Sequence, residues 1–259
     1  MQKHKNVSYA FVSPPYQPMR LRDVFTLSAV GKFYVHSTNG TNGTGSGCNI
    51  CLYYNNTAYR FFLTARHNIV NPSINRYNGF FNINESYVKF ELGVDSQKAY
   101  RINKILLPDY DIDLALLLLE SSVTQENCIR LSRQNISLGQ ELWVPHYPQG
   151  GSMKISHGVA TTMDFGDPDG NFAYLDRLSM YEESDCFRYT CPTERGSSGS
   201  PVILKDSNEV IGVHVRGDQN TQDFHTALKV NYGMIENTFL TELRVLFAAP
   251  TYSLSQPRP

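Results

Sequence analysis

The chain has 259 residues, of which 41% are hydrophobic, and its formal net charge is −1. This length and apolar content are typical of a globular protein with a sizeable core and argue against an intrinsically disordered one. The nearly neutral charge argues against a nucleic-acid or polyanion partner, and the lack of a long apolar run argues against a membrane-spanning helix.

The N-terminal segment does not have the pattern of a secretory signal. Met1–Asn6 is basic, but a Tyr- and Pro-rich sequence follows it in place of an apolar stretch. A cytoplasmic location is therefore favoured, while export by another route or release from a longer precursor stays open.

Residues 24–119 predict a series of short β-strands. Asn55 and Asn56 form a turn signal between two strand-like runs, as in a β-hairpin. Leu114–Leu119 is a continuous apolar run, which is typical of a strand buried on both sides. The strands expected in this half are residues 24–36, 48–54, 59–65, 87–92, 99–107 and 114–119.

A second series of strands follows the polar segment 121–134. Residues 235–246 carry apolar side chains at helical spacing, so a C-terminal helix with one buried face is expected. Many short strands with one terminal helix are typical of a β-barrel protein. The strands expected in this half are one within 139–151 and those at 153–163, 172–175, 187–190, 201–204, 210–214 and 228–232.

Three segments carry residue types that nucleophilic catalysis requires. The segment 190–203 surrounds Ser198 with small residues, whose flexible backbone can place N–H groups beside a hydroxyl. On its own, this segment is equally typical of a Ser- and Gly-rich turn between strands. An apolar run upstream ends at His67, and Asp113 directly precedes the expected buried strand.

These segments resemble a known family of enzymes. The order His67, Asp113, Ser198 is that of chymotrypsin-like enzymes and differs from the subtilisin and α/β-hydrolase orders. The sequences Thr-Ala-Arg-His67, Asp113-Leu-Ala-Leu and Gly-Ser-Ser198-Gly-Ser-Pro resemble the three signature segments of chymotrypsin-fold serine peptidases. The last of them is most similar to the glutamyl-endopeptidase branch, which has Gly-x-Ser-Gly-Ser-Pro-Val where trypsin has Gly-Asp-Ser-Gly-Gly-Pro.

The resemblance covers about residues 25–245 and implies an all-β protein. Its fold would consist of two six-stranded antiparallel β-barrels of the chymotrypsin-like type with a C-terminal helix, and the active site would lie between the barrels. The implied division of the chain is an N-terminal extension (1–22), a barrel that carries His67 and Asp113 (23–127), a barrel that carries Ser198 and the S1 pocket (128–248) and a flexible tail (249–259).

The resemblance also implies a role for each site residue. Ser198 would be the nucleophile, His67 the base that takes its proton, and Asp113 the group that orients the imidazole. Backbone N–H groups of Gly196 and Ser198 would bind the oxyanion. Asp111 is the rival of Asp113, which we prefer because Leu-Ala-Leu follows it directly. This chemistry needs a protein or peptide substrate and no metal or organic cofactor.

The differences from trypsin concern activation and specificity. Ser197 stands where trypsin has an Asp that pairs with a freed N-terminus, so that activation device is expected to be absent. Pro192 stands where trypsin has the Asp that selects Lys or Arg, so a basic P1 residue is not expected. Thr193 and His214 occupy positions that glutamyl endopeptidases and viral 3C-like proteases use to hold a P1 side-chain oxygen, and Gly217 completes the expected substrate-binding set. Cleavage after Glu is therefore predicted, with Gln as second choice.

Other functions remain as alternatives at this stage. One is a protease-like binding module with an inactive or gated triad, and another is a viral-type protease that processes a polyprotein. An esterase or lipase is disfavoured, because the triad order differs and the Gly-x-Ser-x-Gly elbow between a strand and a helix is missing.

The five cysteines do not suggest the usual disulfide of secreted trypsin-like enzymes. No cysteine follows His67 closely, so the loop around the histidine cannot be closed, and mostly reduced thiols are expected. Cys48 and Cys51, together with Cys186 and Cys191, could instead hold a structural zinc. Buried free thiols are the favoured interpretation of the two.

Overall fold

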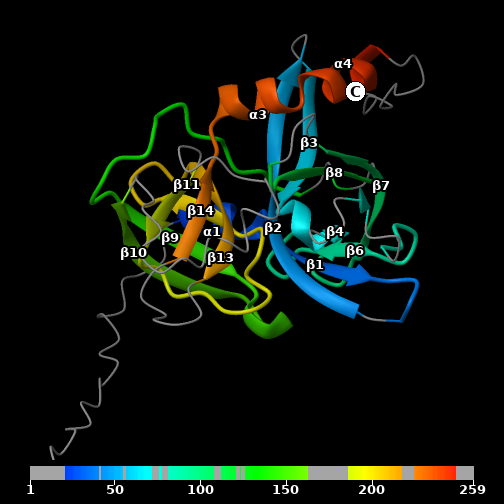
Figure 1. Cartoon of the computed structure of the whole chain (residues 1–259), viewed down its shortest axis with the longest axis horizontal. Helices are drawn as coiled ribbons and strands as arrows, with labels where there is room; N and C mark the ends of the chain where they lie inside the picture. Colours follow the sequence, from blue (N-terminus) through cyan, green and yellow to red (C-terminus); the bar gives the residue numbers. More distant parts are fainter. Residues whose placement is uncertain are drawn as a thin grey trace, which may run out of the picture.

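In the computed structural model, the chain forms two closed antiparallel β-barrels that lie side by side (Figure 1). The predicted fold class is thereby confirmed. The predicted strand at 172–175, the rival Asp111 and the tail at 249–259 lie outside the described residues. The structure describes residues 21–40, 42–54, 57–71, 76–77, 81–107, 112–120, 123, 126–162, 186–217 and 225–248.

The first barrel is closed in the order β1-β2-β3-β8-β7-β6, so every strand has two neighbours and no sheet edge is left open. Phe62 lies at its centre and packs edge-to-face on Phe33 and Phe90. β2 begins earlier than the predicted residue 48, because it pairs with β1 along the whole length of that strand. The strands are β1 (Val30–His36), β2 (Asn42–Tyr54), β3 (Thr57–Thr64), β6 (Tyr87–Lys89), β7 (Tyr100–Leu106) and β8 (Ala115–Leu119), with the small pair β4 (Val70–Asn71) and β5 (Arg76–Tyr77) beside them.

The second barrel is closed in the order β10-β11-β14-β13-β12-β9. Its interior is apolar, and Val144, Phe187 and Val202 are completely buried in one cluster. A 3₁₀ turn, η4 (Pro148–Gly150), follows its first strand. The strands are β9 (Glu141–His146), β10 (Lys154–Thr162), β11 (Cys186–Tyr189), β12 (Pro201–Leu204), β13 (Val210–Gly217) and β14 (His225–Lys229).

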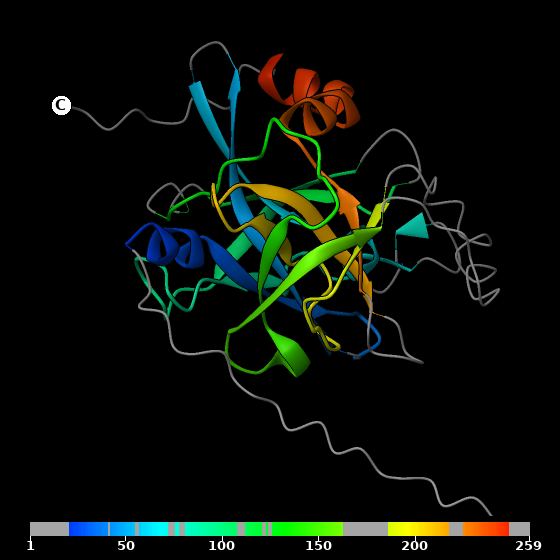
Figure 2. The same ribbon diagram turned by 90° about the vertical axis from the view of Figure 1, so that its left-hand side faces the viewer.

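The prediction of a strand from residue 24 was wrong for its first part. Residues Leu21–Ser28 form helix α1, and β1 begins only at Val30. Arg22 donates a hydrogen bond to the Asp206 carbonyl at 2.7 Å, and Asn208 donates one to the Asp23 carboxylate at 2.8 Å. Contacts with the β12–β13 turn therefore stabilise this short helix, and Figure 2 shows it beside the second barrel.

The C-terminal helix is divided in two. Helix α3 (Tyr232–Thr238) begins at Asn231, whose side chain accepts a hydrogen bond from the backbone of Met234, and Phe239 separates it from α4 (Leu240–Ala248). In both views these helices lie across one end of the molecule, near the far ends of β2 and β3 (Figures 1 and 2). The predicted apolar stripe is buried, as Ile235 and Leu243 illustrate. None of the helices in the described ranges has the length and apolar character to cross a membrane.

The expectation of mostly reduced cysteines was wrong for one pair. Cys51 and Cys128 form a disulfide that links β2 to the segment between the barrels. Their separation of 77 residues concealed the pairing in the sequence. The zinc alternative fails as well, because side chains three positions apart on a strand point to opposite faces. Cys48 accordingly lies in the buried core, where burial raises the pKa of its thiol.

Reduction of the disulfide should destabilise the protein without unfolding either barrel. A cross-link over 77 residues restricts the unfolded chain enough to contribute about 4 kcal/mol. Urea unfolding with and without dithiothreitol measures this difference, and the double variant Cys51→Ser/Cys128→Ser should behave like the reduced protein. Thiol titration of the unreduced, denatured protein should count three free cysteines. Five titrated thiols, or equal unfolding midpoints, would contradict the pairing.

Candidate active site

The pairing of β3 with β8 brings His67 and Asp113 together. Thr64, the last residue of β3, is in register with Ala115, the first residue of β8. His67 follows in the 3₁₀ turn η1 (Arg66–Asn68), and Asp113 lies just before β8. One carboxylate oxygen of Asp113 lies 2.6 Å from Nδ1 of His67. The other oxygen accepts a hydrogen bond from the backbone N–H of His67 at 2.7 Å. The two predicted residues therefore form a rigid pair.

The surroundings of this pair adjust the basicity of the imidazole. Burial lowers the pKa of His67, but the charge of Asp113 and its hydrogen bond together outweigh this effect, so the pKa lies above its ordinary value. The His67 side chain keeps 26% of its surface exposed, whereas that of Asp113 keeps 1%. A partly exposed imidazole backed by a buried carboxylate is the arrangement of a general base.

The backbone of the predicted nucleophile is bonded to the opposite barrel. The Ser198 carbonyl accepts hydrogen bonds from the backbone of Ser46 at 2.8 Å and from the side chain of Asn68 at 3.0 Å. Asn68 directly follows His67 in the chain, so Ser198 lies close to the histidine. The described residues include no hydrogen bond between the Ser198 hydroxyl and the imidazole, and in unliganded enzymes this contact is often long.

Gly199 allows the close approach of the two barrels. Its backbone has a φ of +88°, which residues with a Cβ rarely adopt, and a Cβ there would collide with the Ser46 carbonyl and the Thr64 hydroxyl. The glycine after the predicted nucleophile is therefore required both by its conformation and by the contact.

A backbone hydrogen bond orients one of the two predicted oxyanion donors, the N–H of Gly196. Gln149, in the turn after β9, donates its N–H to the Arg195 carbonyl at 2.5 Å. The C=O and N–H of a trans peptide point in opposite directions, so the N–H of Gly196 points away from Gln149. Within the described part of the chain, the N–H groups of Gly196 and Ser198 have no hydrogen-bond partner. Both are available to a ligand.

The predicted pocket residues also meet. The hydroxyl oxygen of Thr193 lies 3.2 Å from Nε2 of His214. A Cβ built on Gly217 would lie 3.6 Å from the same oxygen. The sequence analysis missed two partners. His225 lies 2.7 Å from the Thr193 hydroxyl, and the Tyr189 hydroxyl lies 2.7 Å from Nδ1 of His214. Only the pairing of β14 with β13 and β11, which the sequence does not display, brings them here.

The residues of the predicted pocket are themselves uncharged. Burial is the main cause that lowers the pKa of His214 well below its ordinary value, and repulsion from the neighbouring His225 acts in the same direction. Burial raises the pKa of Tyr189, so its hydroxyl keeps the proton. A neutral imidazole and two hydroxyls therefore lie in contact at the predicted pocket.

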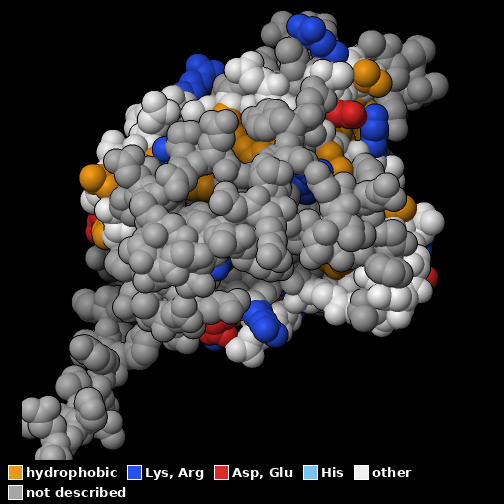
Figure 3. Space-filling view, in the orientation of Figure 1, with side chains coloured by type: hydrophobic (Ala, Val, Ile, Leu, Met, Phe, Trp, Pro, Cys, Tyr) orange, Lys and Arg blue, Asp and Glu red, His pale blue; other side chains and the backbone are white. Residues whose placement is uncertain are grey.

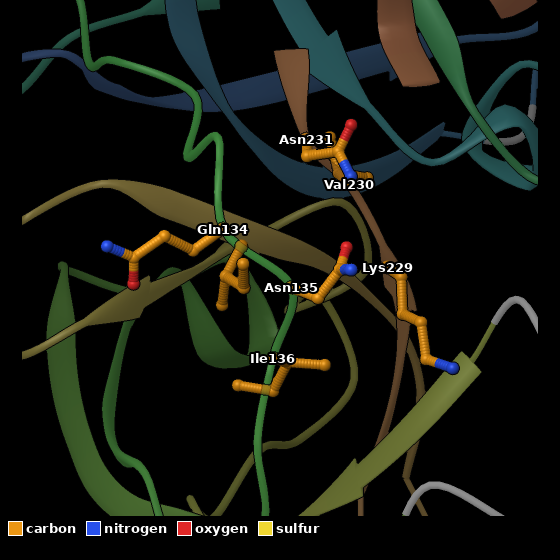
Figure 4. A pocket seen from close by; sticks show the side chains of 7 residues that line it. Gln134, Asn135, Ile136, Lys229, Val230 and Asn231 are labelled. Atoms are coloured by element: carbon orange, nitrogen blue, oxygen red, sulfur yellow. The ribbon is translucent and has the colours of Figure 1, made fainter. Parts of the chain in front are cut away.

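Other surface features lie apart from these residues. A cavity of about 300 Å³ opens at the opposite end of the β13–β14 pair and contains none of the predicted site residues (Figure 4). On the face seen in Figure 3, the described charged side chains are scattered and form no single patch of either sign. The cavity is lined by Gln134, Asn135, Ile136, Ile211, Lys229, Val230 and Asn231.

Solved structures with this fold include several proteases. The active form of the Rv3671c protease from M. tuberculosis gives a TM-score of 0.58 at 14% identity and covers 92% of this chain and 93% of its own. The thermostable serine protease AL20, from an extremophilic microorganism, gives 0.58 at 18% identity over 83% and 97%. The HtrA-type protease AlgW with tripeptide gives 0.58 at 16% identity over 79% and 57%. At these identities the likeness concerns the fold alone.

Sequence comparison gives the family. No curated protein sequence matches the chain. The family model of the trypsin-like peptidase domain matches residues 45–213, a range that contains His67, Asp113 and Ser198. This match and the two barrels together show that the chain belongs to the trypsin-like peptidase domain family and is a trypsin-like serine protease.

Proposed function

We propose that this protease is an endopeptidase that cleaves through an acyl-enzyme on Ser198, after Glu and secondarily after Gln. The observation that carries the proposal is the His67–Asp113 pair, held by contacts of 2.6 and 2.7 Å beside the segment that bears Ser198. An imidazole with a fixed tautomer and a raised pKa can accept a proton from a serine hydroxyl.

The reaction would proceed in two halves. His67 takes the proton of Ser198 while the oxygen attacks the scissile carbonyl, and Asp113 stabilises the resulting imidazolium. The oxyanion accepts hydrogen bonds from the N–H groups of Gly196 and Ser198. His67 then gives its proton to the leaving amine, and a water molecule, deprotonated by the same imidazole, releases the acyl group.

The polar pocket supports selection of a P1 side-chain oxygen. His214 and Thr193 would exchange their mutual contact for hydrogen bonds to this oxygen, while the Tyr189 hydroxyl donates to Nδ1 of His214 and leaves Nε2–H free to donate. A carboxylate accepts stronger hydrogen bonds than an amide, which is why Glu is placed before Gln. Gly217 keeps the space open, because a side chain there would contact both Thr193 and His225.

Replacement of the nucleophile tests the reaction. Ser198→Ala should lower kcat on the order of 10⁶-fold and abolish labelling by a fluorophosphonate, with an unchanged melting temperature. Ser200→Ala is the matched control, because the Ser200 hydroxyl is buried without a hydrogen-bond partner in the described structure and should be dispensable. A Ser198→Ala variant that still cleaves peptides would refute the assignment. An unmutated protein that neither cleaves nor labels would indicate a binding module instead.

The pH profile tests the role of Asp113. Activity should be lost as the pH falls through the raised pKa of His67, and Asp113→Asn should move this acid limb to lower pH, because burial alone then acts on the imidazole. The same substitution should lower kcat about 10⁴-fold, which is the effect of replacing the triad Asp by Asn in a chymotrypsin-type protease. Since the pKa of His67 lies above 6.5, the pair also adds stability below pH 6.5, which is lost as the pH rises through the raised pKa. An acid limb that does not move in the variant contradicts this role.

The pocket predicts discrimination at P1. Hydrogen bonds to a charged group contribute roughly 1.5–3 kcal/mol each, and a Leu side chain can accept neither of the two, so a Leu substrate should be cleaved at least about 10²-fold less efficiently than its Glu counterpart. His214→Ala should remove this preference, and Gly217→Val should block the pocket. Fluorophosphonate labelling should persist in both variants. The measurement is kcat/KM on peptides that differ only at P1. Equal rates after Glu and Leu in the unmutated enzyme would end the proposal.

A further inference from the structure

His146 lies behind the segment that bears the nucleophile and takes no part in the triad. It is the last residue of β9, and it is 3% exposed. Its Nδ1 lies 2.7 Å from the Ser197 hydroxyl and its Nε2 lies 2.9 Å from the Ser156 hydroxyl. Both ring nitrogens therefore bond to hydroxyls, and one of these hydroxyls belongs to the residue before Ser198.

The directions of these hydrogen bonds follow from their outer partners. The Ser156 hydroxyl donates to the Pro192 carbonyl at 2.6 Å, because a carbonyl can only accept, so Ser156 must accept from Nε2–H of His146. The neutral ring then has a lone pair on Nδ1, which accepts the Ser197 O–H. The Ser197 oxygen in turn accepts the N–H of Glu194 at 3.1 Å. The result is one directed chain of four hydrogen bonds.

This chain begins and ends on the same loop. Glu194 supplies its first donor and Pro192 its last acceptor, and these residues flank Thr193 of the proposed pocket. Ser197 is also held through its backbone, since its N–H donates to the Glu194 carbonyl at 3.0 Å and its own carbonyl accepts from Ser200 at 3.0 Å. The imidazole thus fixes both ends of the segment that carries the pocket and oxyanion residues.

We propose that His146, as a neutral imidazole, is the positioning residue that holds residues 192–198 in the conformation required for catalysis. The inference rests on the proposed role of Ser198 as nucleophile. His146 bonds to Ser197, at the position where trypsin uses a charged carboxylate and a freed N-terminus. An internal neutral contact needs no new terminus, so the loop is already ordered before any cleavage of the chain.

The surroundings keep this imidazole uncharged. Burial is the main cause that lowers its pKa to about 4; the charges of Lys154 and His225 act in the same direction, and that of Glu194 opposes them. Protonation would turn Nδ1 into a donor and leave the Ser197 proton without its acceptor. The ring therefore stays in its holding form at the higher pH at which His67 acts as a base.

The experiment compares His146→Ala with His146→Asn, whose side-chain oxygen can reach the place of Nδ1 and accept from Ser197. His157→Ala is the control, because His157 follows Ser156 on β10 with an exposed side chain. Active sites are counted with a fluorophosphonate, kcat and KM are measured per active site on a Glu-P1 peptide, and affinity is measured for the corresponding peptide boronic acid. Binding of the uncleaved peptide is measured in the Ser198→Ala background.

For a positioning residue, His146→Ala should lower kcat per active site about 10²-fold. KM and the binding of the uncleaved peptide should change less, and only through Thr193, which lies on the same segment. The affinity for the boronic acid should fall in parallel, because it depends on the oxyanion donors. His146→Asn should recover at least tenfold of the lost rate, and His157→Ala should match the unmutated enzyme.

Two outcomes would overturn the inference. One is a His146→Ala variant with normal kcat per active site, even if fewer molecules are folded, because His146 would then serve stability alone. The other is equal loss in the Ala and Asn variants with unaltered boronic-acid affinity. If instead Ser198→Ala remains active, the assignment of the nucleophile fails, which is a separate result.

Discussion

The proposed active site depends on Ser46, a completely buried residue of the first barrel that bonds to the second. Its backbone N–H donates to the Ser198 carbonyl at 2.8 Å, and its hydroxyl donates to the Gly196 carbonyl at 2.8 Å. The same hydroxyl accepts the N–H of Tyr147 at 3.1 Å, while the Ser46 carbonyl accepts the hydroxyl of Thr64 at 2.8 Å. One serine therefore links the strand that leads to His67 with the two loops beside the predicted oxyanion donors.

This linkage is needed because each barrel is closed by itself. Closed barrels have no free sheet edge through which one could continue into the other, so contacts between side chains and loops must fix their relative position. The terminal helices strengthen the assembly. Helix α1 precedes the first barrel but bonds to a turn of the second, and helices α3 and α4 follow the second barrel but reach the ends of β2 and β3. A site formed between such units can be rigid although no sheet continues from one barrel into the other.

Sequence reasoning was most successful where the relevant pattern is local. The apolar run after Asp113 and the small residues around Ser198 predicted a buried strand and a tight loop, and both are present. It was least successful where distant strands pair. His225 lies beside Thr193 only because β14 pairs with β13 in this register. Cys51 forms its disulfide with a residue 77 positions away. The helix at Leu21–Ser28 was missed because its stability comes from contacts with the second barrel, which no local pattern displays.

Three histidines illustrate how hydrogen-bond partners and burial together determine whether an imidazole is charged. His67 faces a carboxylate, which raises its pKa, whereas His146 and His214 face hydroxyls, and burial lowers theirs. A buried ion pair must recover the cost of removing two charges from water, but a neutral ring bonded to hydroxyls does not. Its hydrogen bonds have a direction instead, which only one tautomer satisfies. In the proposed mechanism, charge is thus kept for the ring that exchanges protons, and neutral rings serve where a hydrogen bond of fixed direction is needed.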